Sequence, residues 1–237
     1  MIVVIPMAGA SSRFTNMGMA PKYTLKTRAF RTLFDDAVSS FDKWFDTATF
    51  LIIVKDEYAK EFAEHHAANL GIKDFIVVNL DFLTKGQAET VKLGLQEAGL
   101  ENRTDELVIF NIDSVRHNLV LPEDEVWDTL FDAFYDEDAE PVWSFCKVDK
   151  DMNIIKTAEK RKISPWCSTG LYVFRGVNLY LTAYNEAIKD KSYNYYIAPL
   201  YNKLKGMTNR LLLCPIQDID FAGTPSQYKE YLNKINQ

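Results

Sequence analysis

The first residues of the chain carry the feature that most constrains its fold. An apolar run, Ile2–Pro6, leads into a loop of small residues that ends at Arg13, and Pro21 and Lys22 follow shortly after. Small residues let backbone N–H groups approach a phosphate chain, and the two cations can neutralise its charge. Gly9 is the only glycine of this loop, which therefore matches neither the dinucleotide-binding fingerprint nor the P-loop. A solvated turn is the alternative, but two cations directed at one loop, the second on a segment stiffened by proline, favour a phosphate site.

Length and composition indicate a globular α/β protein. The chain has 237 residues, of which 47% are hydrophobic and 25% charged, and no linker divides it, so we expect a single domain over residues 1–237. The net charge of −6 argues against non-specific nucleic-acid binding, which requires excess Lys and Arg. No apolar run approaches the about 18 residues of a membrane span, so we expect no membrane insertion. Three scattered cysteines and the absence of a signal peptide favour a cytoplasmic protein.

Short apolar runs alternate with amphipathic stretches along the chain. The expected strands are Ile2–Pro6, Thr49–Val54, Phe75–Asn79, Leu107–Asn111, Val142–Val148, Leu171–Phe174 and Leu211–Pro215. The expected helices are Leu33–Phe45, Glu57–Asn69, Gln87–Ala98, Glu123–Tyr135, Asn178–Lys189, Tyr195–Lys205 and Ser226–Ile235. Alternation over the first half predicts a parallel, doubly wound sheet, which binds ligands beyond the carboxyl ends of its strands. The second half is less regular, and Asp149–Ser164 is expected to form a polar loop.

Three aspartates are candidates for binding a metal ion. Asp113 follows the expected strand Leu107–Asn111 and faces the same crevice as the first loop, where it could hold Mg²⁺ on a triphosphate. Asp218 and Asp220 precede a turn in which Thr224 caps the final helix, and either could supply a second carboxylate. For Asp113, a role in capping the next turn is the alternative.

Two further segments are candidates for binding substrates. Gly86 and Gln87 lie at the start of an expected helix. Gly86 has no side chain, so the edge of a nucleobase could contact its backbone, and Gln87 offers amide hydrogen bonds. A role in helix initiation is compatible with base binding. Lys160 and Lys162 belong to a charged run in the expected polar loop. Such runs are usually solvated surface, but in an acidic protein they could receive the phosphate of a second substrate.

Taken in order, these motifs resemble those of the nucleotidylyltransferases that join a nucleoside triphosphate to a sugar phosphate or a similar phosphate monoester. The short members found in capsule and lipopolysaccharide biosynthesis are the most similar. The matching segments are Met7–Phe14 with Pro21 and Lys22, Gly86–Thr90, Asn111–Asp113, Glu159–Lys160 before Ser168–Tyr172, and Gly223–Pro225. The resemblance implies a Rossmann-like three-layer α/β/α fold with a mostly parallel, mixed central sheet, of the nucleotide-diphospho-sugar transferase type. It implies no C-terminal β-helix of the kind found in longer members.

The resemblance also implies roles for individual residues. The nucleotide would be bound by Ala8, Gly9, Ala10, Ser11, Ser12, Gly86 and Gln87. The catalytic residues would be Arg13, Lys22 and Lys160, the acceptor-binding residues Lys160, Lys162 and Gly170, and the Mg²⁺ ligands Asp113 and Asp220. The chain departs from the family pattern at three positions. Ala10 replaces a second glycine, and Arg161 replaces a proline. Phe221 stands two residues before Gly223, where the second metal carboxylate is usual.

The expected partners are a nucleoside triphosphate and a small phosphate monoester. An oxygen of the acceptor phosphate would attack the α-phosphorus and expel pyrophosphate. Because this nucleophile is already anionic, no general base is required, and catalysis would depend on positioning, Mg²⁺ and cationic side chains. Three alternatives stay open. They are a cytidylyltransferase for a non-sugar phosphate such as phosphocholine, a glycosyltransferase that uses a finished sugar nucleotide, and a catalytically silent nucleotide-binding module.

Overall fold

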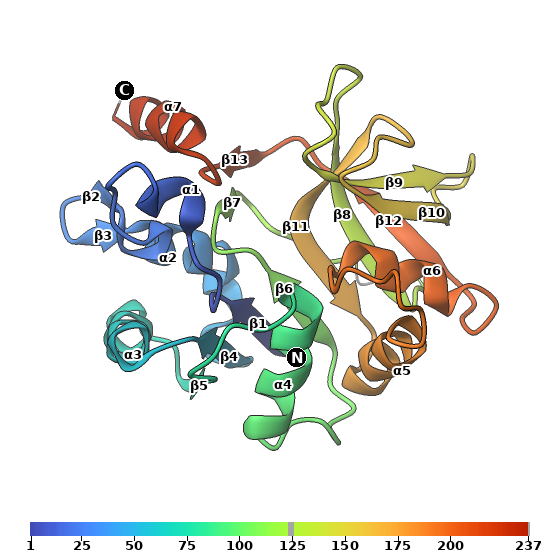
Figure 1. Ribbon diagram of the computed structural model, residues 1–237, viewed down its shortest axis with the longest axis horizontal. Helices are drawn as coiled ribbons and strands as arrows, with labels where there is room; N and C mark the ends of the chain where they lie inside the picture. Colours follow the sequence, from blue (N-terminus) through green and yellow to red (C-terminus); the bar gives the residue numbers. More distant parts are fainter. Residues whose placement is uncertain (123–125, 237) are drawn as a thin grey trace.

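A computed structural model describes residues 1–122 and 126–236. Over these residues, nine strands form one mixed sheet at the centre of the molecule (Figure 1). Its main path runs β10-β9-β11-β6-β1-β4-β5, with β8 paired to β11 and β12 paired to β8. The strands are β1 (Ile2–Pro6), β4 (Thr49–Val54), β5 (Asp74–Asn79), β6 (Leu107–Phe110), β8 (Thr129–Tyr135), β9 (Ser144–Val148), β10 (Ile154–Glu159), β11 (Trp166–Phe174) and β12 (Leu211–Pro215).

Helices and two small two-stranded sheets surround the central sheet. The small sheets pair β2 (Lys26–Arg28) with β3 (Arg31–Thr32) and β7 (Ser114–Arg116) with β13 (Ile219–Phe221). The helices are α1 (Ser12–Thr15), α2 (Leu33–Val38), α3 (Glu57–Leu70), α4 (Gln87–Glu97), α5 (Val177–Ala187), α6 (Tyr201–Leu204) and α7 (Pro225–Ile235). Among the described residues, no helix is long and apolar enough to cross a membrane.

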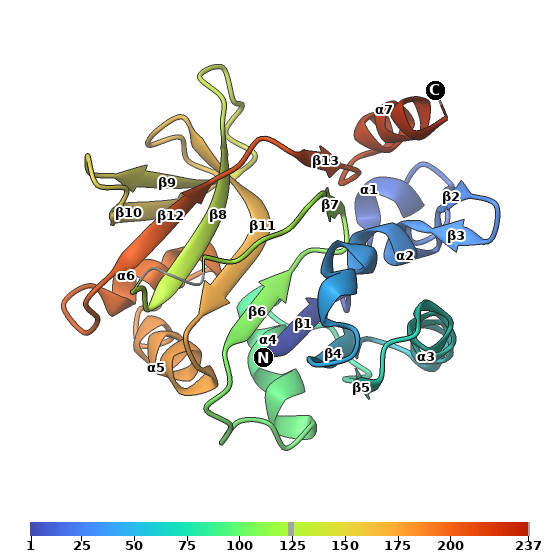
Figure 2. The same ribbon diagram turned by 180° about the vertical axis from the view of Figure 1, so that it is seen from behind.

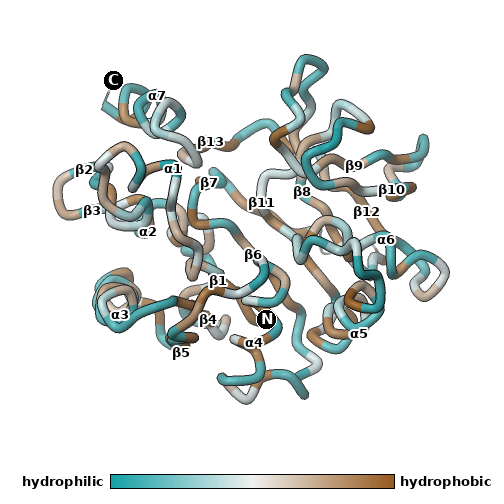
Figure 3. Tube along the Cα trace, in the orientation of Figure 1, coloured by the Kyte–Doolittle hydropathy of each residue, from teal (hydrophilic) through white to brown (hydrophobic). Residues whose placement is uncertain are grey.

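The central sheet is covered on both faces, which confirms the expected three layers. Side chains alternate along β1, so that Ile2 and Val4 pack with α4 and α5, whereas Val3 and Ile5 pack with α2 and α3. All four are fully buried, and each contributes about 1.5–3 kcal/mol relative to exposure. Figure 3 shows the apolar residues concentrated in the central strands. The neighbours β6, β1, β4 and β5 are parallel, as expected for the first half, and β11 joins β6 antiparallel, so the sheet is mixed.

The prediction of a helix over Glu123–Tyr135 is wrong for the residues of this segment that the structure describes. Residues 123–125 lie outside the described residues. Thr129–Tyr135 instead forms β8, between β11 and β12. Phe131 and Ala133 are fully buried in this strand. Closely spaced aromatic and apolar residues suit a strand covered on both faces, but a short run of this kind can also match helical spacing.

The polar loop expected over Asp149–Ser164 is also wrong in part, because it contains the edge strand β10. Only part of this strand packs inward, and its exposed residues interrupt the apolar pattern that marks a strand. The outer edge of β10 is covered by α6. The side-chain amide of Asn202 accepts a hydrogen bond from the backbone N–H of Thr157 and donates one to the Thr157 carbonyl, both at 2.9 Å. A side chain from a segment distant in sequence therefore completes the hydrogen bonding of this edge.

The C-terminal segment crosses back from the second half of the sheet to the first. After β12 the chain forms β13, which pairs antiparallel with β7, and then α7, which lies beside α1 and the β2–β3 pair (Figure 2). The Tyr231 hydroxyl donates to Asp36 at 2.9 Å, and the Tyr228 hydroxyl donates to the carbonyl of Lys26. This crossing brings Gly223 and Thr224 next to the first loop.

We predict that Asn202→Ala lowers the free energy of unfolding by about 1–3 kcal/mol, since it leaves two backbone groups of the buried Thr157 without partners. Urea denaturation followed by circular dichroism measures the loss. The control is Asn209→Ala, at an exposed position, which we expect to stay within about 0.5 kcal/mol of wild type. Equal midpoints for the two variants would contradict the role assigned to Asn202.

Candidate active site

The first loop lies beyond the carboxyl end of β1. Ser11 adopts a left-handed conformation with φ of 52°, and α1 begins at Ser12. Gly9 and Ala10 are exposed. The backbone N–H of Lys22 donates a hydrogen bond to the Ser11 hydroxyl at 3.4 Å, which connects the segment that carries Lys22 to the first loop. The predicted convergence of this lysine on the first loop is therefore present in the fold.

The side chain of Lys22 reaches a carboxylate that follows the neighbouring strand. Its Nζ lies 2.7 Å from Oδ2 of Asp113. Since β1 and β6 are parallel neighbours, the first loop and Asp113 leave the sheet at the same edge. Burial raises the pKa of Asp113, but the charges of Lys22 and Arg13 outweigh it and hold this pKa below its usual range. Asp113 is therefore an ionised carboxylate next to cations.

Two pockets meet at Asp113. The loop pocket is lined by the first loop at Ala8 and Gly9, by Lys22, and by several residues before and at the start of α4, which include the predicted Gly86 and Gln87. The aromatic pocket is lined by Trp143, Tyr172, Tyr196 and Phe221, with Arg13, Ser144, Glu159 and Gly170. Gln87, Asn111 and Asp113 line both pockets. Ligands held in the two pockets can therefore meet beside Asp113.

The aromatic pocket combines ring side chains in contact with one another and polar groups. The ring centroids of Trp143 and Phe221 are 4.7 Å apart. Ser144 donates a hydrogen bond to the Glu159 carboxylate, and the Tyr172 hydroxyl donates to Ser144 at 3.3 Å. Burial raises the pKa of Glu159. A wall of this composition can hold a hydroxylated ring or an organic cation.

A bulge in β11 fixes the boundary between the two pockets. The pairing of β11 with β8 shifts register between Ser168 and Tyr172, and Gly170 has φ of +89°. A Cβ added at Gly170 would lie 2.5 Å from Nδ2 of Asn111. The Asn111 side chain accepts a hydrogen bond from Gln87. Glycine at 170 thus allows Asn111 to reach the helix that carries Gln87, and bulges commonly aim residues in this way.

A buried charged network supports this bulge, and the sequence analysis did not identify it. Arg116 donates to Asp132 at 3.1 Å, and the Thr169 hydroxyl donates to the same carboxylate at 2.6 Å. The carbonyl of Thr169 accepts from Ser114, the residue after Asp113, at 2.7 Å. Burial raises the pKa of Asp132, and Arg116 opposes this. A charged residue inside an apolar run, as at Asp132, is the signal that could have revealed the network.

Asp220 does not share a pocket with Asp113. Its carboxylate lies 2.7 Å from His117 Nε2 and 2.7 Å from Lys234 Nζ. Successive residues of a strand point to opposite faces, so Phe221 lines the aromatic pocket while Asp220 faces away. Asp218 does not line either pocket, and its side chain accepts a hydrogen bond from Asn118 at 3.3 Å. The structure thus gives no support to the prediction of Asp220 as a metal ligand, and the same holds for Asp218.

The donor set at Asp113 fits a cation that takes most of its ligands from a bound phosphate chain. Mg²⁺ is commonly held by one or two carboxylates together with substrate phosphates and water. A Cβ added at Gly223 would lie 3.1 Å from Asp113 Oδ2, so the glycine leaves this oxygen accessible. Over residues 1–122 and 126–236, no three His, Cys, Asp or Glu side chains gather as a metal site. Asp113 is the one predicted ligand that lies in the pockets.

The predicted acceptor lysines differ in position. Lys160 Nζ lies 2.7 Å from the Tyr196 hydroxyl, at the rim of the aromatic pocket. Lys162 donates instead to the carbonyl of Glu137, in the turn between β8 and β9. Arg13 lines the aromatic pocket, and its guanidinium lies 3.5 Å from the Gly223 carbonyl. Of the two lysines, the structure places Lys160 next to the candidate site, and their substrate contacts stay predictions.

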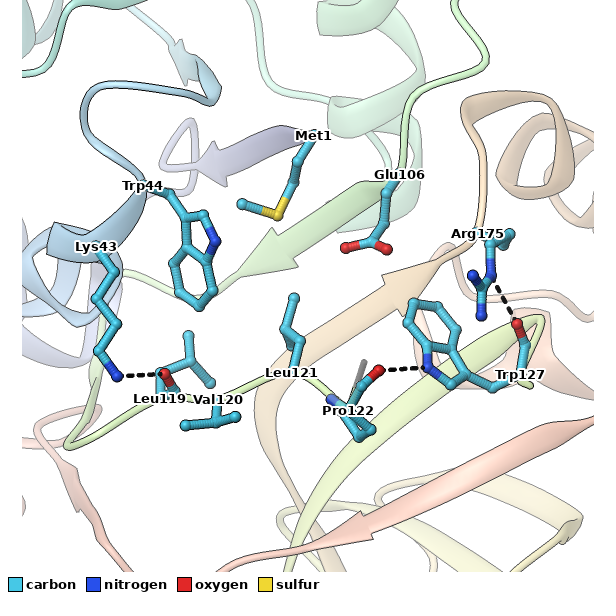
Figure 4. A pocket seen from close by; sticks show the side chains of 10 residues that line it. All are labelled: Met1, Lys43, Trp44, Glu106, Leu119, Val120, Leu121, Pro122, Trp127 and Arg175. Carbon is cyan, nitrogen blue, oxygen red and sulfur yellow. Dashed lines mark hydrogen bonds between the residues drawn. The ribbon is translucent and has the colours of Figure 1, made fainter. Parts of the chain in front are cut away.

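Another groove lies at the opposite edge of the sheet, where β1 and β6 begin (Figure 4). It is lined by Met1, Trp44, Glu106 and Trp127, and by Arg175, whose guanidinium is 4.0 Å from the Trp127 ring. None of the predicted site residues lines it. The functional candidate is therefore the pair of pockets at the carboxyl ends of the strands.

The fold and the paired pockets are those of a nucleotide-binding α/β transferase. No protein-family model and no curated protein matches the chain. Among solved structures, the nucleoside-diphosphate-sugar pyrophosphorylase from Vibrio cholerae RC9 is 38% identical, with a TM-score of 0.88 over 98% of this chain and 99% of that one. The chain therefore belongs to the sugar-phosphate nucleotidylyltransferase family.

More distant structures share the fold. A candidate glucose-1-phosphate thymidylyltransferase from Bacillus anthracis is 16% identical, with a TM-score of 0.77 over 98% of this chain and 94% of that one. The inositol-1-phosphate CTP transferase from T. maritima is also 16% identical, with a TM-score of 0.75 over 100% and 96%. At this identity the likeness concerns the architecture, and it agrees with the fold class expected from the sequence.

We predict that Gly170→Ala destabilises the protein more than a left-handed backbone alone explains, because the methyl group would collide with Asn111. Gly206→Ala is the matched control, since Gly206 has φ of +81° and open space around its Cβ. We expect a loss of about 1–2 kcal/mol for the control and about 1–3 kcal/mol more for Gly170→Ala. Thermal and urea unfolding measure both, and equal losses would show that the contact with Asn111 has no cost.

Proposed function

We propose that the protein transfers a nucleoside monophosphate from a nucleoside triphosphate to a phosphate monoester and releases pyrophosphate. The observation that carries this proposal is the meeting of two pockets at Asp113, one beside the first loop with Lys22 and one beside Arg13. A transferase of this kind must hold two anionic substrates in contact at one point. Family membership supports the same reaction.

In the proposed complex, the triphosphate lies along the first loop, from Ala8 to Ser12, and the base lies against Gly86 and Gln87. A Cβ at Gly86 would lie 2.8 Å from Tyr195, so packing against Tyr195 already requires a glycine here. Gly86 also lines the loop pocket, where its backbone is available to the base. The β- and γ-phosphates are then within reach of Arg13 and Lys22. The acceptor occupies the aromatic pocket, with its phosphate towards Asp113 and Lys160 at the rim.

The reaction forms a bond between an acceptor phosphate oxygen and the α-phosphorus, and breaks the bond from that phosphorus to the bridging oxygen of the leaving pyrophosphate. The nucleophile carries its own negative charge, so no side chain has to remove a proton. Arg13 and Lys22 offset the charge that accumulates on the leaving group. Mg²⁺, held by Asp113 and phosphate oxygens, would supply further charge neutralisation.

A sugar phosphate is the first candidate acceptor. The Vibrio cholerae relative is named as a nucleoside-diphosphate-sugar pyrophosphorylase. The apolar face of a sugar ring can stack on Trp143 and Phe221, while Ser144 and Glu159 can bind hydroxyl groups. The product would be an activated precursor, which we assign to cell-surface polysaccharide synthesis in the cytoplasm.

A phosphorylated organic cation such as phosphocholine is the second candidate acceptor, and the composition of the aromatic pocket favours it. Rings of Trp143, Tyr172 and Phe221 together with the Glu159 carboxylate form a wall that attracts a quaternary ammonium group. The neighbour from T. maritima is named for an acceptor other than a sugar phosphate, inositol-1-phosphate. With this acceptor the activity would be that of a cytidylyltransferase or a related enzyme.

We predict that Lys22→Ala and Asp113→Ala each lower turnover by at least about 10²-fold, because each removes a preorganised charge at the reacting phosphates. Pyrophosphate release in a coupled assay gives the rate. Lys26→Ala, at an exposed lysine outside both pockets, is the control and should retain wild-type turnover. Near wild-type turnover in either active-site variant would remove that residue from the mechanism.

We predict that a matrix of four nucleoside triphosphates against sugar phosphates, phosphocholine and inositol phosphate gives pyrophosphate release with one acceptor class. Glu159→Gln separates the two candidates. It should raise KM for an acceptor with a cationic head group at least about tenfold, because a charged partner is lost, and change KM less for a sugar phosphate, whose sugar ring is uncharged. Release of nucleoside diphosphate from a finished sugar nucleotide would indicate a glycosyltransferase instead. Nucleotide binding without turnover across the matrix would indicate a silent module.

A further inference from the structure

The carboxylate proposed as the metal ligand is bound by a lysine. Lys22 Nζ lies 2.7 Å from Asp113 Oδ2, which is the length of a direct, charge-assisted hydrogen bond. Both side chains are largely buried, with exposed fractions of 25% and 22%. An ammonium group and a divalent cation would compete for the lone pairs of the same oxygen. The contact between Lys22 and Asp113 therefore limits when a metal ion can bind to Asp113.

The other charges around Asp113 also oppose a free divalent cation. Arg13 lies close enough to act electrostatically on Asp113 and lines the same pocket. Phe221 occupies the strand position that faces this pocket from β13, and Asp220 is bound to His117 and Lys234 on the other face. The centre thus combines one carboxylate with two permanent cations. Before any phosphate arrives, Lys22 and Arg13 repel a divalent cation at Asp113, and like charges repel strongly where solvent is partly excluded. The Glu159 carboxylate lines the aromatic pocket as well, but it is hydrogen-bonded to Ser144.

A nucleoside triphosphate reverses this balance. Its phosphate oxygens provide new anionic partners for Lys22 and Arg13 and further ligands for a metal ion. Once Lys22 contacts phosphate, the Oδ2 atom of Asp113 is released. The open side of this oxygen faces Gly223, where there is no side chain to block it.

We propose that Lys22 is the counter-ion of Asp113 in the nucleotide-free protein, and that this carboxylate becomes available to a metal ion only when the triphosphate binds. The metal site then forms together with the nucleotide and not before it. This inference rests on the proposed function, because it takes Asp113 as the metal ligand. It adds to that function a second role for Lys22, which exchanges one anionic partner for another and so links nucleotide binding to metal binding.

The test measures retention of Mn²⁺ alone by the full-length protein in equilibrium dialysis, without nucleotide. We expect weak retention by wild type and an affinity at least about tenfold higher in Lys22→Met, since the competing ammonium is removed. Lys22→Gln, which keeps a polar side chain without charge, should show the same gain. Lys26→Met removes one positive charge from an exposed lysine and should behave as wild type. In Lys22→Met/Asp113→Asn the gain should disappear.

A second arm adds the α,β-methylene analogue of the nucleoside triphosphate that the activity matrix selects. Nucleotide retention by wild type should rise with Mn²⁺, and Asp113→Asn should lose most of that rise. Tight Mn²⁺ binding by wild type alone, or no gain in both Lys22 variants, overturns the inference while leaving the proposed reaction intact. A Mn²⁺ effect that survives Asp113→Asn overturns the inference together with the metal assignment of the proposed function.

Discussion

The parallel pairing of β1 with β6 is the constraint on which the rest of the site depends. It makes both strands end at the same edge of the sheet, so that the loop after β1 and Asp113 after β6 become neighbours although they are about a hundred residues apart in sequence. The ion pair between Lys22 and Asp113 is the direct result. Both strands are buried on both faces, so neither can shift without exposing apolar side chains. The positions of the site residues that follow them are therefore fixed by core packing.

The second half of the chain adds a differently built wall to this edge. There most strand pairs are antiparallel, although β12 joins β8 in parallel, and a bulge in β11 with Gly170 at its centre turns the backbone towards Asn111. Asp132 supports the bulge by accepting hydrogen bonds from both Arg116 and Thr169. The bulge separates a pocket of small residues and backbone from a pocket of aromatic rings. That division suits one substrate recognised through its phosphates and another recognised through its organic part.

The C-terminal segment connects the two halves and has the largest effect on the surroundings of Asp113. The pairing of β13 with β7 fixes which residues face inward, and this register puts Phe221 in the aromatic pocket and Asp220 on the far side. A shift of one residue would exchange them. The chain thus has an aromatic ring where the family pattern has a carboxylate, which leaves Asp113 with cations as its nearest charged neighbours.

The sequence by itself determined the first loop with Arg13 and Lys22, the helix start at Gly86 and Gln87, the position of Asp113 and the parallel half of the sheet. These features are local, or follow from strands that are apolar along their whole length. Tertiary structure decided that Thr129–Tyr135 is a strand, that β10 forms an edge completed by Asn202, and that Asp220 faces away from the site. The physical reason is common to all three. Each depends on pairing partners and registers contributed by distant segments, and a short or partly polar run carries no such information in its own spacing.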